Sequence, residues 1–87
     1  MVSYKVVHHI SGRIRIEVPS IKRLSVNKLK GLFIVLSSLP VPIGIKGIRV
    51  NPLTYSLVIE YDPRLVDVIE YVKDMASSRT IMNTIAK

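Results

Sequence analysis

The feature that most constrains the fold is the run RIRIEV at residues 13–18, in which charged and apolar side chains alternate strictly. Successive side chains of a β-strand point to opposite faces, so a period of two among β-branched residues predicts a half-buried strand. The apolar set is expected to face the core and the charged set to face away from it: Ile14, Ile16 and Val18 inside, Arg13, Arg15 and Glu17 outside.

The flanking residues predict where this strand begins and ends. Residues 4–9 are expected to form another short strand. One face of it would hold the alternate side chains Tyr4, Val6 and His8. Gly12 separates the two segments and is expected to adopt a positive φ or to form a bulge. Pro19 is expected to end the second segment, since proline has no backbone N–H to give to a sheet.

Two further segments predict amphipathic helices. The first begins after Ser25, a residue type that caps helix N-termini, and ends before Pro40. Its apolar stripe comprises Val26, Leu29, Leu32, Phe33, Leu36 and Leu39. The second is expected to begin with Asp62 as its cap and Pro63 at its first helical position, and to end at residues 77–79. Its buried stripe comprises Leu65, Val68, Ile69, Val72 and Ala76.

Two more strands are expected at residues 46–51 and 55–61. A turn at Asn51 and Pro52 would join them as an antiparallel hairpin. The inward side chains of this hairpin are expected to be Ile48, Val50, Tyr55, Leu57, Ile59 and Tyr61. Residues 80–86 fit either a final strand or a last helical turn.

The resulting order, β-α-β-β-α-β in 87 residues, predicts a single α+β domain spanning residues 1–87. The economical arrangement is the ferredoxin-like split βαβ fold, an antiparallel sheet with both helices on one face. The other face of the sheet is then free. It is expected to carry the outward side chains Arg13, Arg15, Glu17, Arg49, Ser56 and Glu60.

Positive charge is concentrated in the first part of the chain. The net charge is +7, and residues 1–50 hold nine Lys and Arg side chains against Glu17 alone. Such a surface attracts nucleic acid, acidic lipid or an acidic protein, unless it is simply a solvated basic face. The most apolar segment, residues 32–45, is shorter than a membrane-spanning helix and contains two prolines. No transmembrane segment is expected, and without a signal-peptide pattern the expected location is the cytoplasm.

Two motifs carry a family resemblance. The pattern H-x-x-x-G-R-x-R-x-x-x-P falls on His8, Gly12, Arg13, Arg15 and Pro19. The pattern V-N-P-x-T-G-S-x-x-x-x-Y-D-P falls on Val50, Asn51, Pro52, Thr54, Ser56, Tyr61, Asp62 and Pro63, with Tyr55 where glycine is usual. Together they resemble the degenerate, cysteine-less branch of the heavy-metal-associated domains. That branch occurs at the N-termini of some P-type heavy-metal ATPases and as small stand-alone proteins. The resemblance implies the ferredoxin-like fold and a role in metal homeostasis or metal transport.

Ligand chemistry limits which metals the chain could hold. It has no cysteine, so copper(I) binding through thiolates is disfavoured. A site for zinc, iron or haem is expected to use His8. Adjacent strand residues point to opposite faces, so His8 and His9 cannot both reach one ion without a bulge. The alternative for His8 is a hydrogen-bonded structural histidine.

The sequence favours a binding role. It contains no catalytic triad, phosphate-binding loop or dinucleotide-binding turn, so no enzymatic activity is expected. The first hypothesis, which follows from the resemblance, is a metal-homeostasis domain that docks to a metal-transporting ATPase or to a second copy of itself. Its docking patch would comprise Arg13, Arg15 and Arg49. The alternative hypothesis is that the same arginines bind RNA or another polyanion through phosphates, without reading its sequence.

Overall fold

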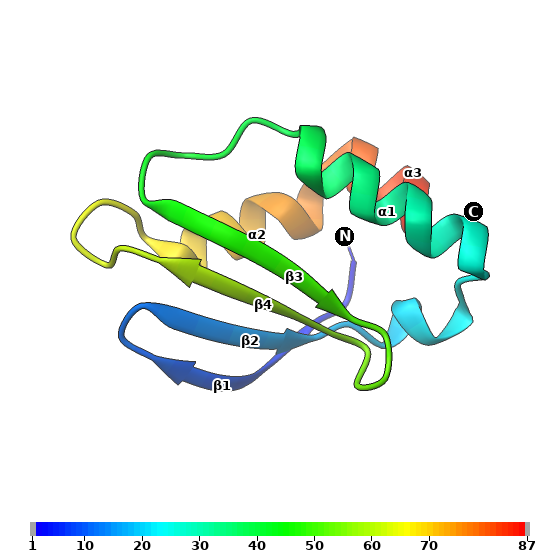
Figure 1. The fold of residues 1–87 in the computed structure, drawn as a ribbon, viewed down its shortest axis with the longest axis horizontal. Coiled ribbons are helices and arrows are strands. Elements are labelled where there is room, and N and C mark those ends of the chain that lie inside the picture. Colours follow the sequence, from blue (N-terminus) through cyan, green and yellow to red (C-terminus); the bar gives the residue numbers. More distant parts are fainter. Residues whose placement is uncertain (1, 87) are drawn as a thin grey trace.

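A computed structural model describes residues 2–86, and for residues 85 and 86 it describes the backbone alone. It contains a four-stranded antiparallel sheet and three α-helices (Figure 1). The elements in chain order are β1 (Lys5–Ile10), β2 (Arg13–Glu17), the 3₁₀ helix η1 (Pro19–Arg23), α1 (Val26–Ser38), β3 (Ile45–Asn51), β4 (Ser56–Tyr61), α2 (Val68–Ser77) and α3 (Arg79–Ala86). The strands lie in the order β1-β2-β4-β3.

The structure confirms a small α+β fold with an antiparallel sheet, but the exact β-α-β-β-α-β order is not confirmed. The N-terminal segment forms two strands, and residues 79–86 form a helix. The edge beside β2, which the ferredoxin-like fold would give to a C-terminal strand, is occupied by β1. Residues 79–86 therefore have no free place beside β2, and α3 packs against α1, α2 and η1 instead.

A tight turn and a bulge shape the β1–β2 hairpin. Gly12 has a φ of +90°, which confirms the positive φ predicted for it. The pairing shifts register between Val6, which lies opposite Ile16, and His8, which lies opposite Arg15. The extra residue reverses the alternation beyond it. The prediction that Val6 and His8 share a face is therefore wrong: Val6 lies on the helix-covered side and His8 on the open side.

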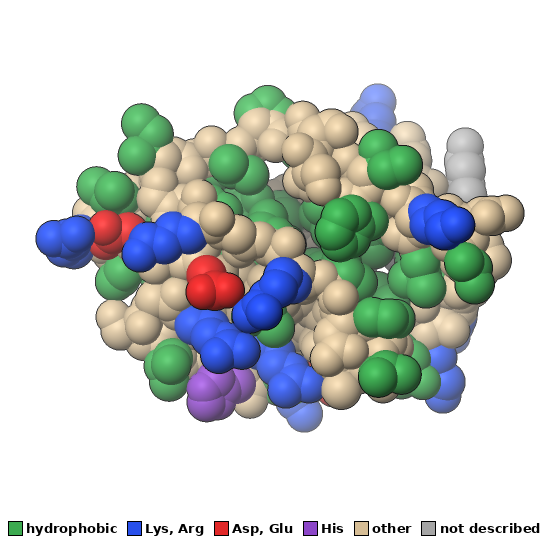
Figure 2. Space-filling model, in the orientation of Figure 1, with side chains coloured by type: hydrophobic (Ala, Val, Ile, Leu, Met, Phe, Trp, Pro, Cys, Tyr) green, Lys and Arg blue, Asp and Glu red, His purple; other side chains and the backbone are tan. Residues whose placement is uncertain are grey.

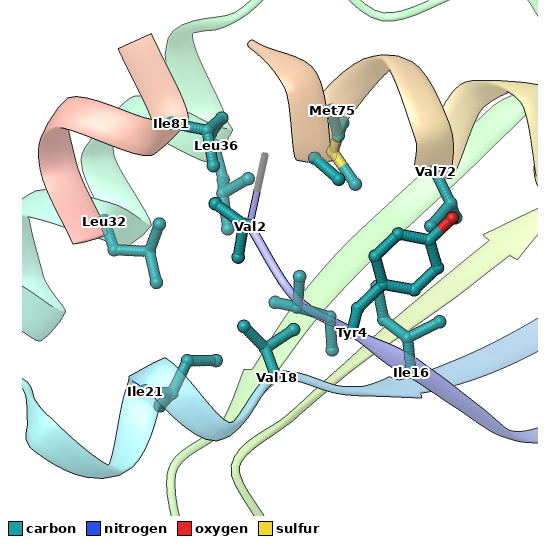
Figure 3. Close-up of a pocket in the computed structure, with 12 residues that line it drawn as sticks. Val2, Tyr4, Ile16, Val18, Ile21, Leu32, Leu36, Val72, Met75 and Ile81 are labelled. Carbon is teal, nitrogen blue, oxygen red and sulfur yellow. The ribbon is translucent and has the colours of Figure 1, made fainter. Parts of the chain in front are cut away.

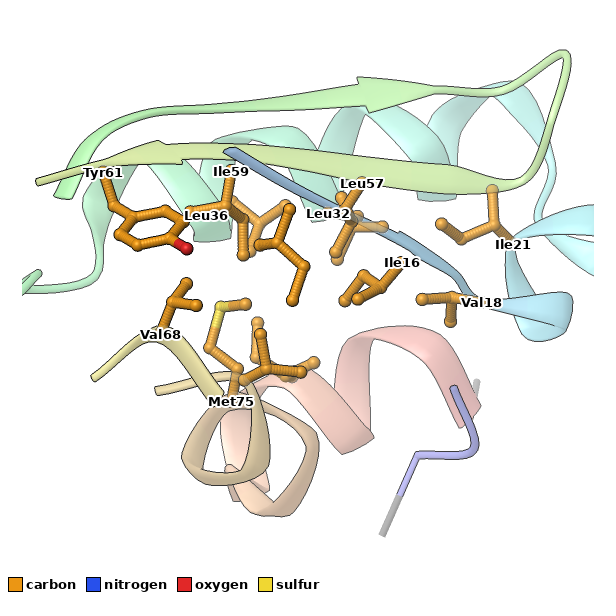
Figure 4. Packing of buried hydrophobic residues seen from close by; sticks show 13 residues of the cluster. Ile16, Val18, Ile21, Leu32, Leu36, Leu57, Ile59, Tyr61, Val68 and Met75 are labelled. Atoms are coloured by element: carbon orange, nitrogen blue, oxygen red, sulfur yellow. The ribbon is translucent and has the colours of Figure 1, made fainter. Parts of the chain in front are cut away.

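The core lies between the sheet and the helices (Figure 4). The sheet contributes the predicted inward side chains of β2 and β4, and the helices contribute one buried face each. The buried apolar residues are Ile14, Ile16, Val18, Ile21, Leu32, Leu36, Leu57, Ile59, Tyr61, Val68, Val72, Met75, Ala76 and Ile81. Helix α1 begins after Ser25, whose Oγ accepts from the N–H of Lys28 at 3.3 Å, and it ends before Pro40 as predicted. Two expected core residues of α1, Val26 and Phe33, are instead exposed.

The second helix begins later than the sequence predicts. Asp62 does not cap it, and Pro63 is not its first residue. Asp67 is the cap, and its Oδ1 accepts from the N–H of Glu70 at 3.2 Å. The reason is that the backbone N–H of Asp62 donates to the carbonyl of Gly44 at 2.7 Å, which holds residues 62–66 in a turn against the loop before β3. Leu65 and Ile69, expected in the core, are exposed.

The predicted hairpin at residues 46–61 is confirmed, with β3 and β4 antiparallel. Asn51 shapes the turn, because its Oδ1 accepts from the N–H of Leu53 at 3.0 Å across Pro52. Tyr55 closes the turn with a φ of +54°. This left-handed conformation is one that glycine adopts without strain, whereas a tyrosine adopts it at a cost.

A small apolar cavity of about 30 Å³ lies between the sheet and the helices (Figure 3). Val2 and Tyr4 form one wall, and the N–H of Val2 donates to the carbonyl of Ala76 at 2.8 Å, which ties the N-terminal segment to α2. Within residues 2–86, no helix combines the length and the apolar character needed to cross a bilayer.

Candidate docking face on the open side of the sheet

The strand register places the three predicted docking arginines on the same face. Across the sheet, one row of neighbours reads His8, Arg15, Val58 and Arg49, from β1 to β3. The next row brings Arg13 of β2 opposite Glu60 of β4. Arg15 and Arg49 therefore lie two strand spacings apart, roughly 10 Å between their backbones, with Val58 between them.

These arginines surround a shallow depression in the open face. It is lined by Arg13, Arg15, Arg49, Val50, Asn51, Pro52 and Val58. Figure 2 shows this side of the molecule, where Lys and Arg side chains gather over the strands around an acidic side chain. The arrangement puts three guanidinium groups beside Asn51 and Val58, which suits a ligand that carries carboxylates or phosphates.

The arginines differ in how their charge is compensated. Arg49 Nη2 lies 3.2 Å from Glu60 Oε1, and both side chains are more than half exposed, so this ion pair adds little stability. Within residues 2–86, Arg13 and Arg15 form no ion pair. The Nε of Arg15 is buried and has no hydrogen-bond partner there.

Among the described residues, no Tyr or Phe side chain belongs to the open face. Tyr61 is buried, while Tyr4 and Tyr55 pack against the core on the helix side of the sheet. The remaining aromatic residues, Phe33 and Tyr71, belong to α1 and α2. For the stacking of unpaired bases, on which sequence-specific RNA recognition by open sheets depends, the described part of this face offers His8 and the arginines but no Tyr or Phe.

The two histidines lie on opposite faces of the sheet. His8 is exposed beside Arg15. His9 lies opposite Ile14, and its Nε2 is 2.7 Å from the hydroxyl of Tyr61. Residues 2–86 contain no group of three or more His, Cys, Asp or Glu side chains placed to hold a metal ion. The assignment of a metal to His8 stays a prediction. Sequence reasoning misses the role of His9, because only the bulge at Val7 turns it to the helix-covered side of the sheet, where it reaches Tyr61 although it stays exposed.

The remaining motif residues shape the backbone. Pro19 follows the end of β2 and begins η1, while Gly12, Asn51 and Pro52 form the two hairpin turns. Asp62 binds Arg64: its Oδ1 accepts from the Arg64 backbone N–H at 2.9 Å, and its Oδ2 from Nη2 at 2.9 Å. These hydrogen bonds from Arg64 lower the pKa of Asp62 from 3.8 to about 2. Pro63, between them, is exposed.

Comparison of the chain with protein-family models, with curated proteins and with solved structures found no match.

Proposed function

We propose that this protein is a binding domain that docks an acidic protein partner on the open face of its sheet. The observation that carries the proposal is the arginine patch, Arg13, Arg15 and Arg49, which surrounds one depression. Arg13 and Arg15 support it most strongly, because within residues 2–86 neither forms an ion pair, whereas Arg49 pairs with Glu60. A guanidinium binds a carboxylate through two parallel hydrogen bonds, so an acidic side chain of the partner would satisfy Arg15.

The nature of the partner follows from the resemblance to cysteine-less heavy-metal-associated domains. On that basis the protein acts in metal homeostasis in the cytoplasm, by docking to a metal-transporting ATPase or to a second copy. It performs no catalytic step of its own. Its role in handling metal does not depend on thiolates, because the chain has none. A zinc, iron or haem ligand would come from His8, which is exposed next to the patch.

A second candidate function is sequence-independent binding of RNA or another polyanion. The observation that favours it is charge: residues 1–50 hold nine basic side chains against one acidic side chain. Phosphates would contact the arginines, and the tyrosines and Phe33, which lie elsewhere, would stack on no base. Affinity would then fall steeply with added salt.

The test compares two pairs of charge-removing substitutions. Arg13→Gln with Arg15→Gln alters the patch, while Lys28→Gln with Lys30→Gln removes the same charge from exposed positions of α1. The probes are a fluorescent ten-residue polyglutamate peptide and a fluorescent single-stranded oligonucleotide of mixed sequence. Each lost charge-assisted hydrogen bond is worth about 1.5–3 kcal/mol, so the arginine pair should weaken peptide binding at least about tenfold. The lysine pair should leave it within about twofold.

The outcomes separate the two candidate functions. Preferential binding of the peptide, lost only with the arginine pair, supports protein docking. If the protein binds the oligonucleotide more tightly than the peptide, and both double variants lose the same affinity, the protein is a general polyanion binder without a specific patch. If the variant with both arginine substitutions binds both probes as the wild type does, the open face is not the binding site. Thermal melting of each variant shows whether the fold is retained.

A further inference from the structure

Strand β3 lies at the edge of the sheet and has a groove beside it. It pairs with β4 on one side, and no other described strand pairs with its outer edge. The groove lies between this edge and α1. It is lined by Phe33, Leu36, Ser37, Val41, Ile45, Lys46, Gly47, Ile48 and Val50. Figure 2 shows the molecule hollowed beside the sheet, with apolar side chains at the margin.

The groove presents apolar side chains to solvent. Phe33 is 54% exposed and Val41 is 46% exposed, although both are large and apolar. An unpaired strand edge next to an apolar groove is the combination to which extended peptides add as a further strand. Backbone hydrogen bonds to the edge would provide affinity, and alternate side chains of the peptide would enter the groove.

The charge around the groove indicates what kind of segment fits. Strand β3 and the groove lining contain the basic residues Lys46 and Arg49 and no Asp or Glu, while Glu60 of the neighbouring β4 pairs with Arg49. Lys46 lines the groove, and Arg49 lies on the open face of the same strand. A strand added to β3 would therefore place one set of its side chains in the groove, near Lys46, and the other set on the open side, near Arg49.

We propose that the outer edge of β3 and the groove along α1 receive an extended segment of a partner protein in which apolar and acidic residues alternate. The proposal goes beyond docking on the open face, because its main contacts are the strand edge and the groove, and only Arg49 and Val50 also border the open-face depression. A second copy of this chain fits less well. Pairing β3 with the same strand of another copy would bring two segments without acidic residues together, with Arg49 near its counterpart.

The test uses an eight-residue peptide of alternating Glu and Val, acetylated and amidated at its ends. It is titrated into the ¹⁵N-labelled protein and followed by amide chemical shifts. Saturable shifts are expected in residues 45–51 and 33–41. Phe33→Ala should weaken binding at least about tenfold, because it removes the largest exposed group of the groove. The matched control is Ile34→Ala, next to it on α1, 64% exposed and outside the groove, which should change affinity less than about twofold.

Other outcomes would overturn the proposal. An alternating Lys and Val peptide that binds equally well would show that charge complementarity plays no part. Equal effects of Phe33→Ala and Ile34→Ala would show that the groove is not the site. The variant carrying Arg13→Gln and Arg15→Gln should bind the Glu-Val peptide as the wild type does, and loss of binding there would assign the peptide to the open face. A dimer in sedimentation equilibrium that Phe33→Ala dissociates would identify a second copy as the occupant.

Discussion

His8 and His9 are neighbours in the chain with different structural roles. His9 Nε2 lies 2.7 Å from the Tyr61 hydroxyl, and Tyr61 is only 5% exposed. His8 is exposed on the other face, across from Arg15. A hydrogen bond of this kind contributes about 1 kcal/mol, and without His9 the Tyr61 hydroxyl would keep only its longer hydrogen bond to the carbonyl of Ile10, at 3.4 Å.

We therefore expect His9→Ala to lower the free energy of unfolding by about 1 kcal/mol and His8→Ala to change it by less than about 0.5 kcal/mol. Urea denaturation of both variants measures the difference. A double-mutant cycle with Tyr61→Phe isolates the contact between the two side chains. A larger effect at His8 than at His9 would contradict the placement of the bulge at Val7.

Tyr55 adopts a backbone conformation that a side chain makes costly. Its φ of +54° lies in the left-handed region, and the ring packs partly against the core with Lys22 Nζ 5.9 Å from the ring centroid. Replacing the residue removes both the strain and these contacts, so a single variant mixes two opposite effects. Comparing Tyr55→Gly with Tyr55→Ala separates them, because both lose the ring and only glycine is free of the strain.

The expected order of stability is the reverse of the usual one. Tyr55→Gly should be more stable than Tyr55→Ala by about 0.5–1 kcal/mol, although glycine normally costs more conformational entropy than alanine. Thermal or urea unfolding of the pair measures it. If Tyr55→Ala is the more stable of the two, the turn does not need the left-handed conformation.

At the scale of the elements, the sequence predicts the features that depend on residues close together in the chain. The alternation at residues 13–18, the capping residue Ser25 and the stop before Pro40 each act through neighbours in the chain, and all three are confirmed. The start predicted for α2 is wrong because the true start depends on a contact with a distant residue. Asp62 and Pro63 carry a good helix-start signal, but the hydrogen bond from Asp62 to Gly44 holds them in a turn.

Gly44 connects the loop before β3 to the turn before α2. It has a φ of +110°, and a Cβ placed there would lie 2.9 Å from Leu65 Cβ and 3.1 Å from Val66 Cγ1. A side chain at this position is therefore both strained and obstructed. Gly47, three residues on, lies outside the left-handed region. Apart from its chain neighbours, no atom comes within 4 Å of the position that a Cβ would occupy there.

Gly44→Ala should destabilise the fold by about 2–3 kcal/mol, and Gly47→Ala should stay within about 0.5 kcal/mol of the wild type. Denaturant midpoints of the two variants measure this difference. Amide shifts of residues 62–68 show whether the loss is local to the start of α2. Equal stability of the two variants would mean that the loop before β3 does not pack against the turn at Leu65 and Val66.

At the scale of the whole molecule, the sequence predicts the arginine patch but not the groove. The patch follows from alternation, because residues on one face of neighbouring strands come together once the strands pair. The groove depends on where α1 lies relative to β3. The spacing of Phe33 along α1 fits a buried stripe, and only the three-dimensional packing leaves it exposed at the sheet edge.

The cavity between sheet and helices limits how stable the molecule is. Its volume of about 30 Å³ exceeds the roughly 10–15 Å³ that one water needs, but its surface is apolar, so we expect it to be dry. Val18 lines it and is 3% exposed. Val18→Ile adds one methylene to this space, and burying a methylene contributes about 0.8 kcal/mol.

Val18→Ile should therefore raise the free energy of unfolding by up to about 0.8 kcal/mol, with an unchanged dependence on denaturant concentration. The control is Val58→Ile on the open face, where the added methylene remains partly in water and the gain should be smaller. Urea denaturation compares the two variants with the wild type. A loss of stability with Val18→Ile would mean that the walls near Val18 are already close-packed, because an added methylene then forces side chains out of their preferred rotamers.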